Sequence, residues 1–236
     1  MADRTEGPLS AAPSAAWSAL ATVLDPELDE PITELGFVTS VAVTGDGTAR
    51  VRLRLPTFYC APNFSYLMVA DAYDAVSAVP GIRHADVQLE DHHAAPEINA
   101  GVAAGVGFAS SFPGEATGEL HDLRRVFLSK AVMAGQDRVA RPLVDAGATP
   151  AQLATMTLGE VPASVDLDRL RRRRTALGLP ADDDAPLLLH PDGSPVTTEQ
   201  VPLHLRRARL TRVGMETNGE YCRSLLDSRY IGVNRR

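Results

Sequence analysis

Cys60 is the residue of this sequence best placed to do chemistry. It lies where a strand-like segment ends and a helix-like segment begins, and in α/β units ligands bind at that edge. Thiols at helix N-termini commonly have lowered pKa values, because the free backbone amides and the helix dipole favour the thiolate. A thiolate is both a ligand for soft metals and a nucleophile. The alternative is that Cys60 is a small buried hydrophobic residue, as free cysteines often are.

Asp25 and Glu27 are the carboxylates that we expect nearest to this thiol. They flank Pro26, and proline disfavours a helical residue before it, so they lie on a loop that follows a helix. This loop could approach the same edge as Cys60 and offer oxygen ligands or a proton acceptor.

A further polar group follows the last predicted strand, where His92 and His93 are adjacent and Glu97 comes shortly after. Imidazole and carboxylate groups suit iron or zinc, and a strand end could bring them near Cys60. Two adjacent histidines on a strand point in opposite directions, so only one of them could face the thiol. The simpler interpretation is a polar strand exit, and additional metal ligands are the alternative.

The elements around Cys60 predict an α+β fold, with a small domain in the order α-β-β-α-β. The clearest strand is at residues 50–55, where arginines alternate with aliphatic residues, so that one face is polar and the other packs in the core. A helix with Pro62 in its first turn should follow Cys60, and the β-α-β crossover makes the strands that it connects parallel. The other predicted elements are a helix at 13–24 and strands at 37–43 and 85–90.

The rest of the chain predicts a different organisation. We expect the α/β domain at residues 1–92 and a linker or covering loop, rich in alanine and glycine, at 93–118. A mostly helical domain should occupy residues 119–236. Its expected helices start at a capping box at Thr149, run from Ser164 to Leu177 before Gly178, and start again near Asn218.

The composition excludes several classes of protein. The 236 residues include 23 basic and 30 acidic ones, a net charge of −7 that argues against a nucleic-acid-binding protein. Arginine runs at 169–174 and 206–212 are therefore expected to be solvated helix faces or a docking face for an acidic protein. The sequence contains no uninterrupted apolar run of about 18 residues, so it predicts no membrane span. The first residues are unlike a secretory signal, so we expect a cytoplasmic protein.

Cys222 is the second cysteine, so the sequence predicts neither a disulfide framework nor a four-cysteine zinc site. Cys222 and Leu226 are four residues apart in a helical pattern, so both can face the same core. A buried structural role is the simpler interpretation, because free cysteines are commonly buried. Cys222 becomes a candidate second ligand if the C-terminal part of the chain folds back over Cys60.

Four short motifs, in their order and spacing, resemble the SufT/PaaD-like iron–sulfur cluster assembly family over roughly residues 15–92. They are Asp25-Pro26-Glu27-Leu28, Leu35-Gly36-Phe37-Val38, Thr57-Phe58-Tyr59-Cys60 and Val79-Pro80-Gly81-Ile82. The resemblance implies a small α/β domain whose single cysteine helps to deliver iron–sulfur clusters. It assigns Asp25 and Glu27 to an acidic loop and Thr57 and Cys60 to a cysteine loop. The family usually has proline directly after the cysteine, where this chain has Ala61.

What the resemblance implies is a maturation factor rather than an enzyme. Cys60, assisted by Asp25, Glu27 and Thr57, would transiently hold iron or an iron–sulfur cluster and pass it to a client metalloprotein. The phenylacetate-pathway branch of the family is associated with a multicomponent oxygenase, so the expected client is an oxygenase component or its reductase. The helical domain would recognise the client, and a homodimer is a further expectation.

The residues themselves leave two other functions open. One is a cysteine-dependent hydrolase or transferase that uses Cys60 with His92 or His93 as its base. The other is a non-catalytic adaptor in which Cys60 is buried and an arginine-rich helix forms the interface. The reactivity of Cys60 in the native protein would separate these two functions.

Overall fold

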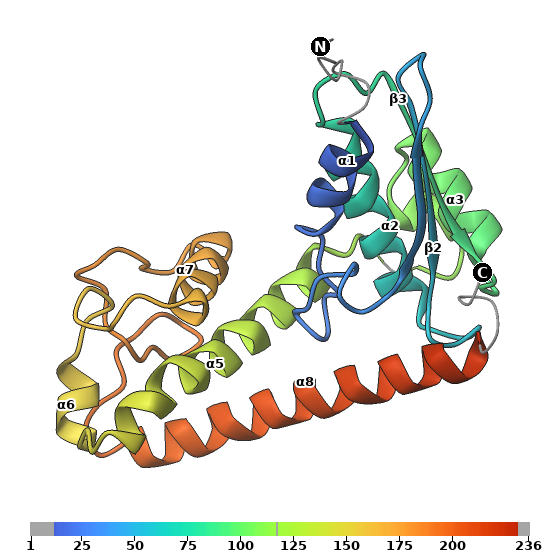
Figure 1. Ribbon diagram of the computed structural model, residues 1–236. Helices are drawn as coiled ribbons and strands as arrows, with labels where there is room; N and C mark the ends of the chain where they lie inside the picture. The colour runs from blue at the N-terminus through green and yellow to red at the C-terminus, as the bar shows by residue number, and fades with distance from the viewer. Residues whose placement is uncertain (1–11, 117, 231–236) are drawn as a thin grey trace, which may run out of the picture. The chain divides into compact units, whose positions relative to one another are not determined.

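The computed structural model describes residues 12–116 and 118–230, which form two compact units (Figure 1). The first unit contains the described residues up to His121 together with those from Asn218 onward. The second unit is Asp122–Thr217. The first unit therefore draws on both ends of the chain, which differs from the predicted division into residues 1–92 and 119–236.

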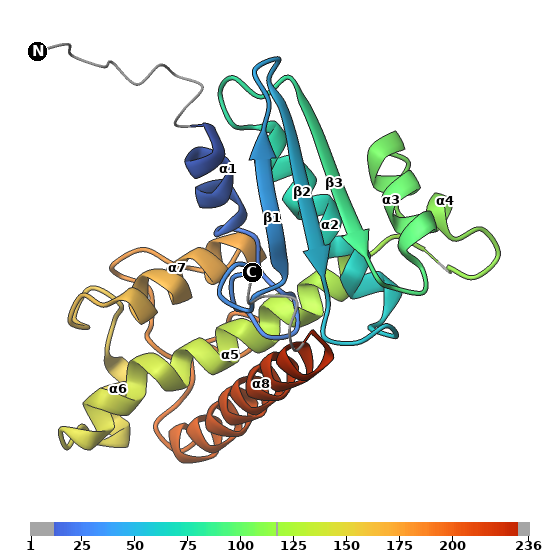
Figure 2. The same cartoon turned by 45° about the vertical axis from the view of Figure 1, so that its right-hand side comes forward.

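A three-stranded sheet forms the centre of the first unit (Figure 2). Strands β1 (Val38–Val43) and β2 (Thr48–Arg54) are antiparallel, and β2 is parallel to β3 (His84–Glu90). Helix α2 (Pro62–Ser77) connects the parallel pair. Gly47 in the β1–β2 turn has φ of +84°, and a Cβ there would lie 2.8 Å from the Gly81 carbonyl oxygen, so the turn requires glycine. The predicted α-β-β-α-β order is confirmed.

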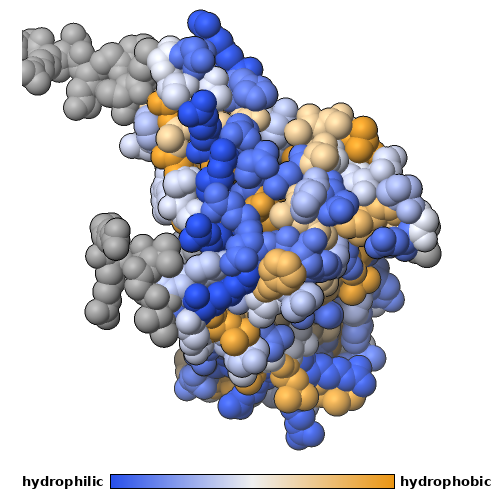
Figure 3. Space-filling view, turned by 90° about the vertical axis from the view of Figure 1, so that its right-hand side faces the viewer, coloured by the Kyte–Doolittle hydropathy of each residue, from blue (hydrophilic) through white to orange (hydrophobic). Residues whose placement is uncertain are grey.

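Helices α1 (Ala12–Leu20) and α2 cover one face of the sheet (Figures 1 and 2). In β2 and β3 the residues that face these helices are buried, and they alternate with mostly polar residues on the other face. Figure 3 shows that other face as a band of hydrophilic side chains. Arg52 pairs there with Asp86 at 2.8 Å, and Arg54 pairs with Glu90 at 3.1 Å. The prediction of a polar arginine face on this strand is confirmed.

The stretch predicted as a linker or covering loop, residues 93–118, instead contains two helices, α3 (Ala95–Ala104) and α4 (Phe108–Ser111). Alanine is the best helix former, so an alanine-rich stretch needs only a few apolar contacts to be fixed as a helix. Ile98 and Val102 of α3 and Phe112 after α4 supply those contacts by packing into the core of the first unit.

The second unit is mostly helical, as predicted. It contains most of α5 (His121–Asp145), the helices α6 (Pro150–Thr155) and α7 (Val165–Leu177), and the first part of α8 (Val201–Arg229). The capping box at the start of α6 is confirmed by the contacts between Thr149 and Gln152. Gly178 ends α7 in a left-handed conformation, also as predicted.

Helix α8 begins at Val201, and not near Asn218 as the sequence predicted. Pro202 occupies its first turn, where a missing backbone N–H is tolerated. From Asn218 onward the helix belongs to the first unit, and Leu226 is buried in that unit's core. Within the described residues, no helix is both long and apolar enough to cross a membrane.

Candidate thiol site around Cys60

Cys60 lies in the loop between β2 and α2, directly before Ala61, which is the N-cap residue of the helix. The position predicted for the thiol, between a strand end and a helix start, is therefore confirmed. Its side chain is half-buried and packs against the core of the first unit. The Thr57 hydroxyl lies 3.3 Å from the Cys60 sulfur. A hydroxyl can donate to a sulfur, so Thr57 is placed to stabilise negative charge on Cys60.

His92 holds the backbone of Cys60 in place, and its hydrogen bonds go to groups other than the Cys60 sulfur. Its Nε2 lies 2.7 Å from the Cys60 carbonyl oxygen, and the Ala94 amide donates to its Nδ1 at 3.2 Å. Because Nδ1 accepts, we assign the ring proton to Nε2, which donates to Cys60. Burial lowers the pKa of His92, while the hydrogen bond to Cys60 opposes this shift. Both nitrogens are thus engaged by the backbone.

His93 belongs to an aromatic group beside the cysteine loop. Its ring lies 5.6 Å from that of Tyr59 and 6.1 Å from that of Phe58, between centroids. Tyr59 is 79% exposed and Phe58 is 40% exposed, so this aromatic group faces solvent. Glu97 is exposed in the first turn of α3. Within residues 12–116 and 118–230, no group of three or more His, Cys, Asp or Glu side chains is assembled for a metal.

Asp25 shapes the acidic loop from inside. Its side chain is buried, and its Oδ1 accepts from the backbone N–H groups of Glu27 and Leu28 at 2.8 and 2.9 Å. Burial raises the pKa of Asp25 to about 6, although the two backbone hydrogen bonds act in the opposite direction. Glu27, two residues further on, is half-buried. Asp25 is therefore a loop-forming residue as well as a potential proton acceptor.

Cys222 returns to the first unit with the last part of α8. It is half-buried and packs against the same core as Cys60. The pKa of Cys222 is raised to about 11, mainly by burial and with smaller contributions from the nearby Asp25, Cys60 and Glu27. The last part of α8 thus returns to the core on which Cys60 packs, and a ligand role for Cys222 stays a prediction.

The arginine runs are used partly inside the second unit. Arg174 is fully buried and donates to the carbonyl oxygens of Pro186 and Leu187 at 2.7 and 2.5 Å. Arg212 is buried as well and pairs with Asp137 at 2.6 Å. The prediction that these runs are solvated faces is therefore wrong for these two arginines.

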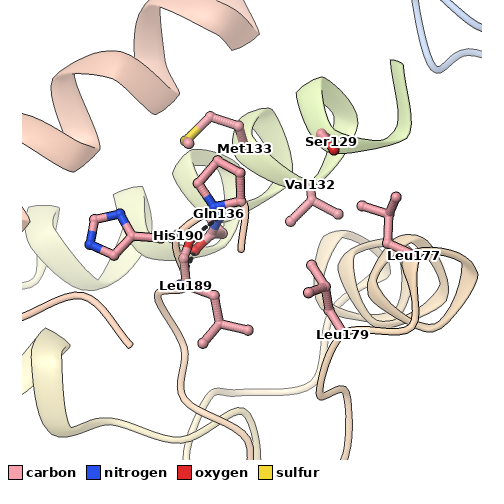
Figure 4. A pocket seen from close by; sticks show the side chains of 9 residues that line it. Ser129, Val132, Met133, Gln136, Leu177, Leu179, Leu189 and His190 are labelled. Atoms are coloured by element: carbon pink, nitrogen blue, oxygen red, sulfur yellow. Dashed lines mark hydrogen bonds between the residues drawn. The ribbon is translucent and has the colours of Figure 1, made fainter. Parts of the chain in front are cut away.

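A small cleft in the second unit does not extend the candidate site. Figure 4 shows Val132 and Met133 of α5 on one side and Leu177 and Leu179 on the other. Gln136 closes it by exchanging hydrogen bonds with the backbone of Leu189. The remaining space holds roughly one water molecule, so the cleft is a packing feature and not a substrate pocket.

The fold and the loop around Cys60 define a small α/β thiol domain, and known proteins share it. Residues 13–89 match the family model for iron–sulfur cluster assembly protein. The resemblance of this N-terminal segment to that family, predicted from its motifs, is confirmed.

The individual relatives below each match about a third of this chain. An iron–sulfur cluster carrier protein of Mycobacterium leprae is 38% identical over 77 residues, which is 33% of this chain and 20% of that protein. An uncharacterized protein of Methanocaldococcus jannaschii is 29% identical over 82 residues, 35% of this chain and 84% of that protein. A crystal structure of a domain of unknown function from Bacillus anthracis aligns with a TM-score of 0.32 and 24% identity, over 34% of this chain and 76% of that one.

Proposed function

We propose that this chain is a maturation factor that receives iron or an iron–sulfur cluster at Cys60 and passes it to a client metalloprotein. The observation that carries the proposal is the half-buried Cys60 thiol with the Thr57 hydroxyl 3.3 Å away, in a segment of the iron–sulfur cluster assembly family. Half-burial suits a carrier, because a ligand that is partly exposed can give up its cargo to another protein.

In this proposal the residues around the thiol have separate tasks. Cys60 is the ligand, since thiolates are the usual ligands of iron–sulfur clusters. Thr57 donates a hydrogen bond to the sulfur, and such bonds tune a metal-bound thiolate. His92 holds the loop by its bond to the Cys60 carbonyl. The task we propose for Asp25 and Glu27, on the acidic loop of the same unit, is to supply the negative charge that favours an incoming iron cation.

The client is a protein whose metal centre must be filled after synthesis, and an oxygenase component or its iron–sulfur reductase is our specific proposal. Phe58 and Tyr59 stand exposed beside Cys60, and aromatic residues are enriched where proteins meet. The net charge of −7 fits a protein partner better than a nucleic acid. A cytoplasmic location and a homodimer remain part of this proposal.

A thiol enzyme is the alternative that the geometry supports least. A nucleophilic cysteine needs a base at its sulfur. His92 directs its Nε2 proton to the Cys60 carbonyl oxygen at 2.7 Å, and His93 lies among Phe58 and Tyr59. The hydrogen bonds of His92 thus serve to position the loop, which favours a non-enzymatic role.

Anaerobic reconstitution with iron and sulfide tests this function. We expect wild type to take up iron with the absorption of a bound cluster, and Cys60→Ala to take up none. Thr57→Val should retain cargo roughly fivefold less well, which corresponds to the loss of one hydrogen bond of about 1 kcal/mol. Thr57→Ser keeps the hydroxyl and should behave as wild type.

Transfer to an apo-ferredoxin completes the test, because a carrier must also release its cargo. Wild type that loads and then fills the acceptor supports the proposal. Equal uptake by Cys60→Ala and wild type would overturn it, and the non-catalytic adaptor would then be the better explanation.

A further inference from the structure

The last part of α8 is anchored to other segments of the first unit by two arginines. Arg223, the residue directly after Cys222, pairs with Glu30 of the acidic loop at 2.6 Å. About two turns further on, Arg229 donates to the carbonyl oxygens of Leu55 and Asp91 at 3.1 and 2.6 Å. Leu55 directly follows β2 and Asp91 directly follows β3. The segment therefore runs from the acidic loop to the strand ends that hold the cysteine loop.

Cys222 lies on the face of the helix that meets these loops. Gly219, Cys222 and Leu226 are spaced by three and four residues, so they share one helix face. A Cβ on Gly219 would lie 2.8 Å from a Glu30 carboxylate oxygen, and a Cβ on Gly36 would lie 3.4 Å from Leu226. Because its neighbours on both sides touch the acidic loop and the residues after it, Cys222 faces the first unit as well.

Both thiols pack against the core of the first unit. Cys60 and Cys222 are each half-buried on that core, and Cys222 is near enough to Cys60 for the two groups to interact electrostatically. A soft metal bound there would deprotonate the thiols that coordinate it.

We infer that Cys60 and Cys222 form one two-thiol site for a soft metal ion or an iron–sulfur cargo, with the Asp25 loop beside it. The cargo's identity rests on the proposed function, whereas the pairing of the two thiols rests on the contacts of α8. Thiolate ligands select zinc, copper(I) and iron–sulfur clusters over hard cations. Iron–sulfur clusters are commonly held by four cysteines, so two from this chain leave two positions for the receiving protein.

A trivalent arsenical tests the pairing without iron, because phenylarsine oxide forms a stable adduct only with two neighbouring thiols. The full-length reduced protein is treated with phenylarsine oxide, washed with a monothiol and weighed by mass spectrometry. We expect wild type to retain one arsenical per chain and to lose both free thiols. Cys60→Ala and Cys222→Ala should each retain none.

A displaced thiol is the matched control. Ser224 lies two residues along the helix from Cys222 and is exposed. Ser224→Cys in the Cys222→Ala background restores the number of thiols but turns one of them away from Cys60, so it should not restore arsenical binding. The pairing would be overturned if this variant retained the arsenical as wild type does. It would also be overturned if wild type retained none.

Iron–sulfide reconstitution of Cys222→Ala separates this inference from the proposed function. A cluster that Cys222→Ala holds several-fold less well than wild type supports the two-thiol site as a cargo site. A cluster that depends on Cys60 alone overturns the role of Cys222 and leaves the proposed function standing. Arsenical binding by wild type without cluster uptake supports the pairing and counts against the proposed function.

Discussion

At the scale of single residues, several buried polar side chains of this protein are held by backbone groups. Asp25 accepts from two backbone amides, His92 lies between the Cys60 carbonyl and the Ala94 amide, and Arg174 donates to two carbonyls. Such a side chain fixes the loop that it bonds to, and removing it leaves buried backbone groups without a partner. Loop shape therefore depends on these residues even where they do no chemistry.

His204 makes the stability of the second unit depend on pH. Burial lowers its pKa to about 4, and the positive charges of His190, Arg207 and Arg174 act in the same direction. An unfolded histidine titrates near pH 6.5, so between about pH 6.5 and 4 the unfolded chain binds more protons than the folded one. The free energy of unfolding should fall across this window as the pH falls, by up to about 3 kcal/mol.

Hydrogen exchange of the second unit at pH 7.5 and pH 5 measures this effect. His204→Gln cannot take up the proton, so its loss of protection between the two pH values should be smaller than that of wild type. Comparing the two proteins at each pH removes contributions that they share, including that of Asp25 with its pKa near 6. Equal losses in both proteins would show that His204 is not the group responsible.

At the scale of elements, Arg229 should hold the last part of α8 in place. It donates to the Leu55 and Asp91 carbonyls, and its side chain is mostly buried against the first unit. Arg229→Ala should raise hydrogen exchange in residues 218–229 and speed the alkylation of Cys222, each by roughly 5- to 30-fold for a loss of about 1–2 kcal/mol.

Arg209→Ala is the matched control for this prediction, because Arg209 is an exposed arginine on the same helix. It should change neither the exchange of residues 218–229 nor the reactivity of Cys222. An equal effect of both substitutions would mean that the Arg229 contacts do not fix this segment.

Sequence patterns predicted the elements whose structure depends on residues close together in the chain. The alternation of Arg50, Arg52 and Arg54 with aliphatic residues was enough to place β2 and its solvent face. Helix α8 was predicted only from Asn218 onward, and Gly214 upstream weakens a helical pattern by about 1 kcal/mol relative to alanine. Gly219 has a packing reason, because a Cβ there would lie 2.8 Å from a Glu30 carboxylate oxygen. Glu30 is far from Gly219 in the sequence, so no local pattern shows this contact.

The same distinction holds for the site. Thr57 and Cys60 are three residues apart, and the family's cysteine loop drew attention to both, so their 3.3 Å contact is a local one. The bond from His92 to the Cys60 carbonyl spans 32 residues, and it arises because β3 ends beside the loop that follows β2. Cys222 comes to the core on which Cys60 packs only because α8 returns to the first unit. No local pattern contains either of these facts.

At the scale of the whole molecule, the two units should differ in how they respond to a core substitution. Leu53 of β2 is buried in the first unit, and Leu170 of α7 is buried in the second, where it contacts Gly135. Replacing either leucine by alanine leaves a cavity that costs about 2–5 kcal/mol. If each unit has its own cooperative core, this loss should stay within the unit that carries the cavity.

Hydrogen exchange followed by mass spectrometry gives the comparison. Leu170→Ala should raise exchange in α5, α7 and the part of α8 before Asn218, while β1, β2 and β3 keep wild-type protection. Leu53→Ala should do the reverse and should also loosen residues 218–229, because that part of α8 packs with the first unit. Cluster uptake should then fall in Leu53→Ala and persist in Leu170→Ala. If both substitutions raised exchange throughout the chain, the two units would unfold together, and the helical unit would contribute to the stability of the thiol site.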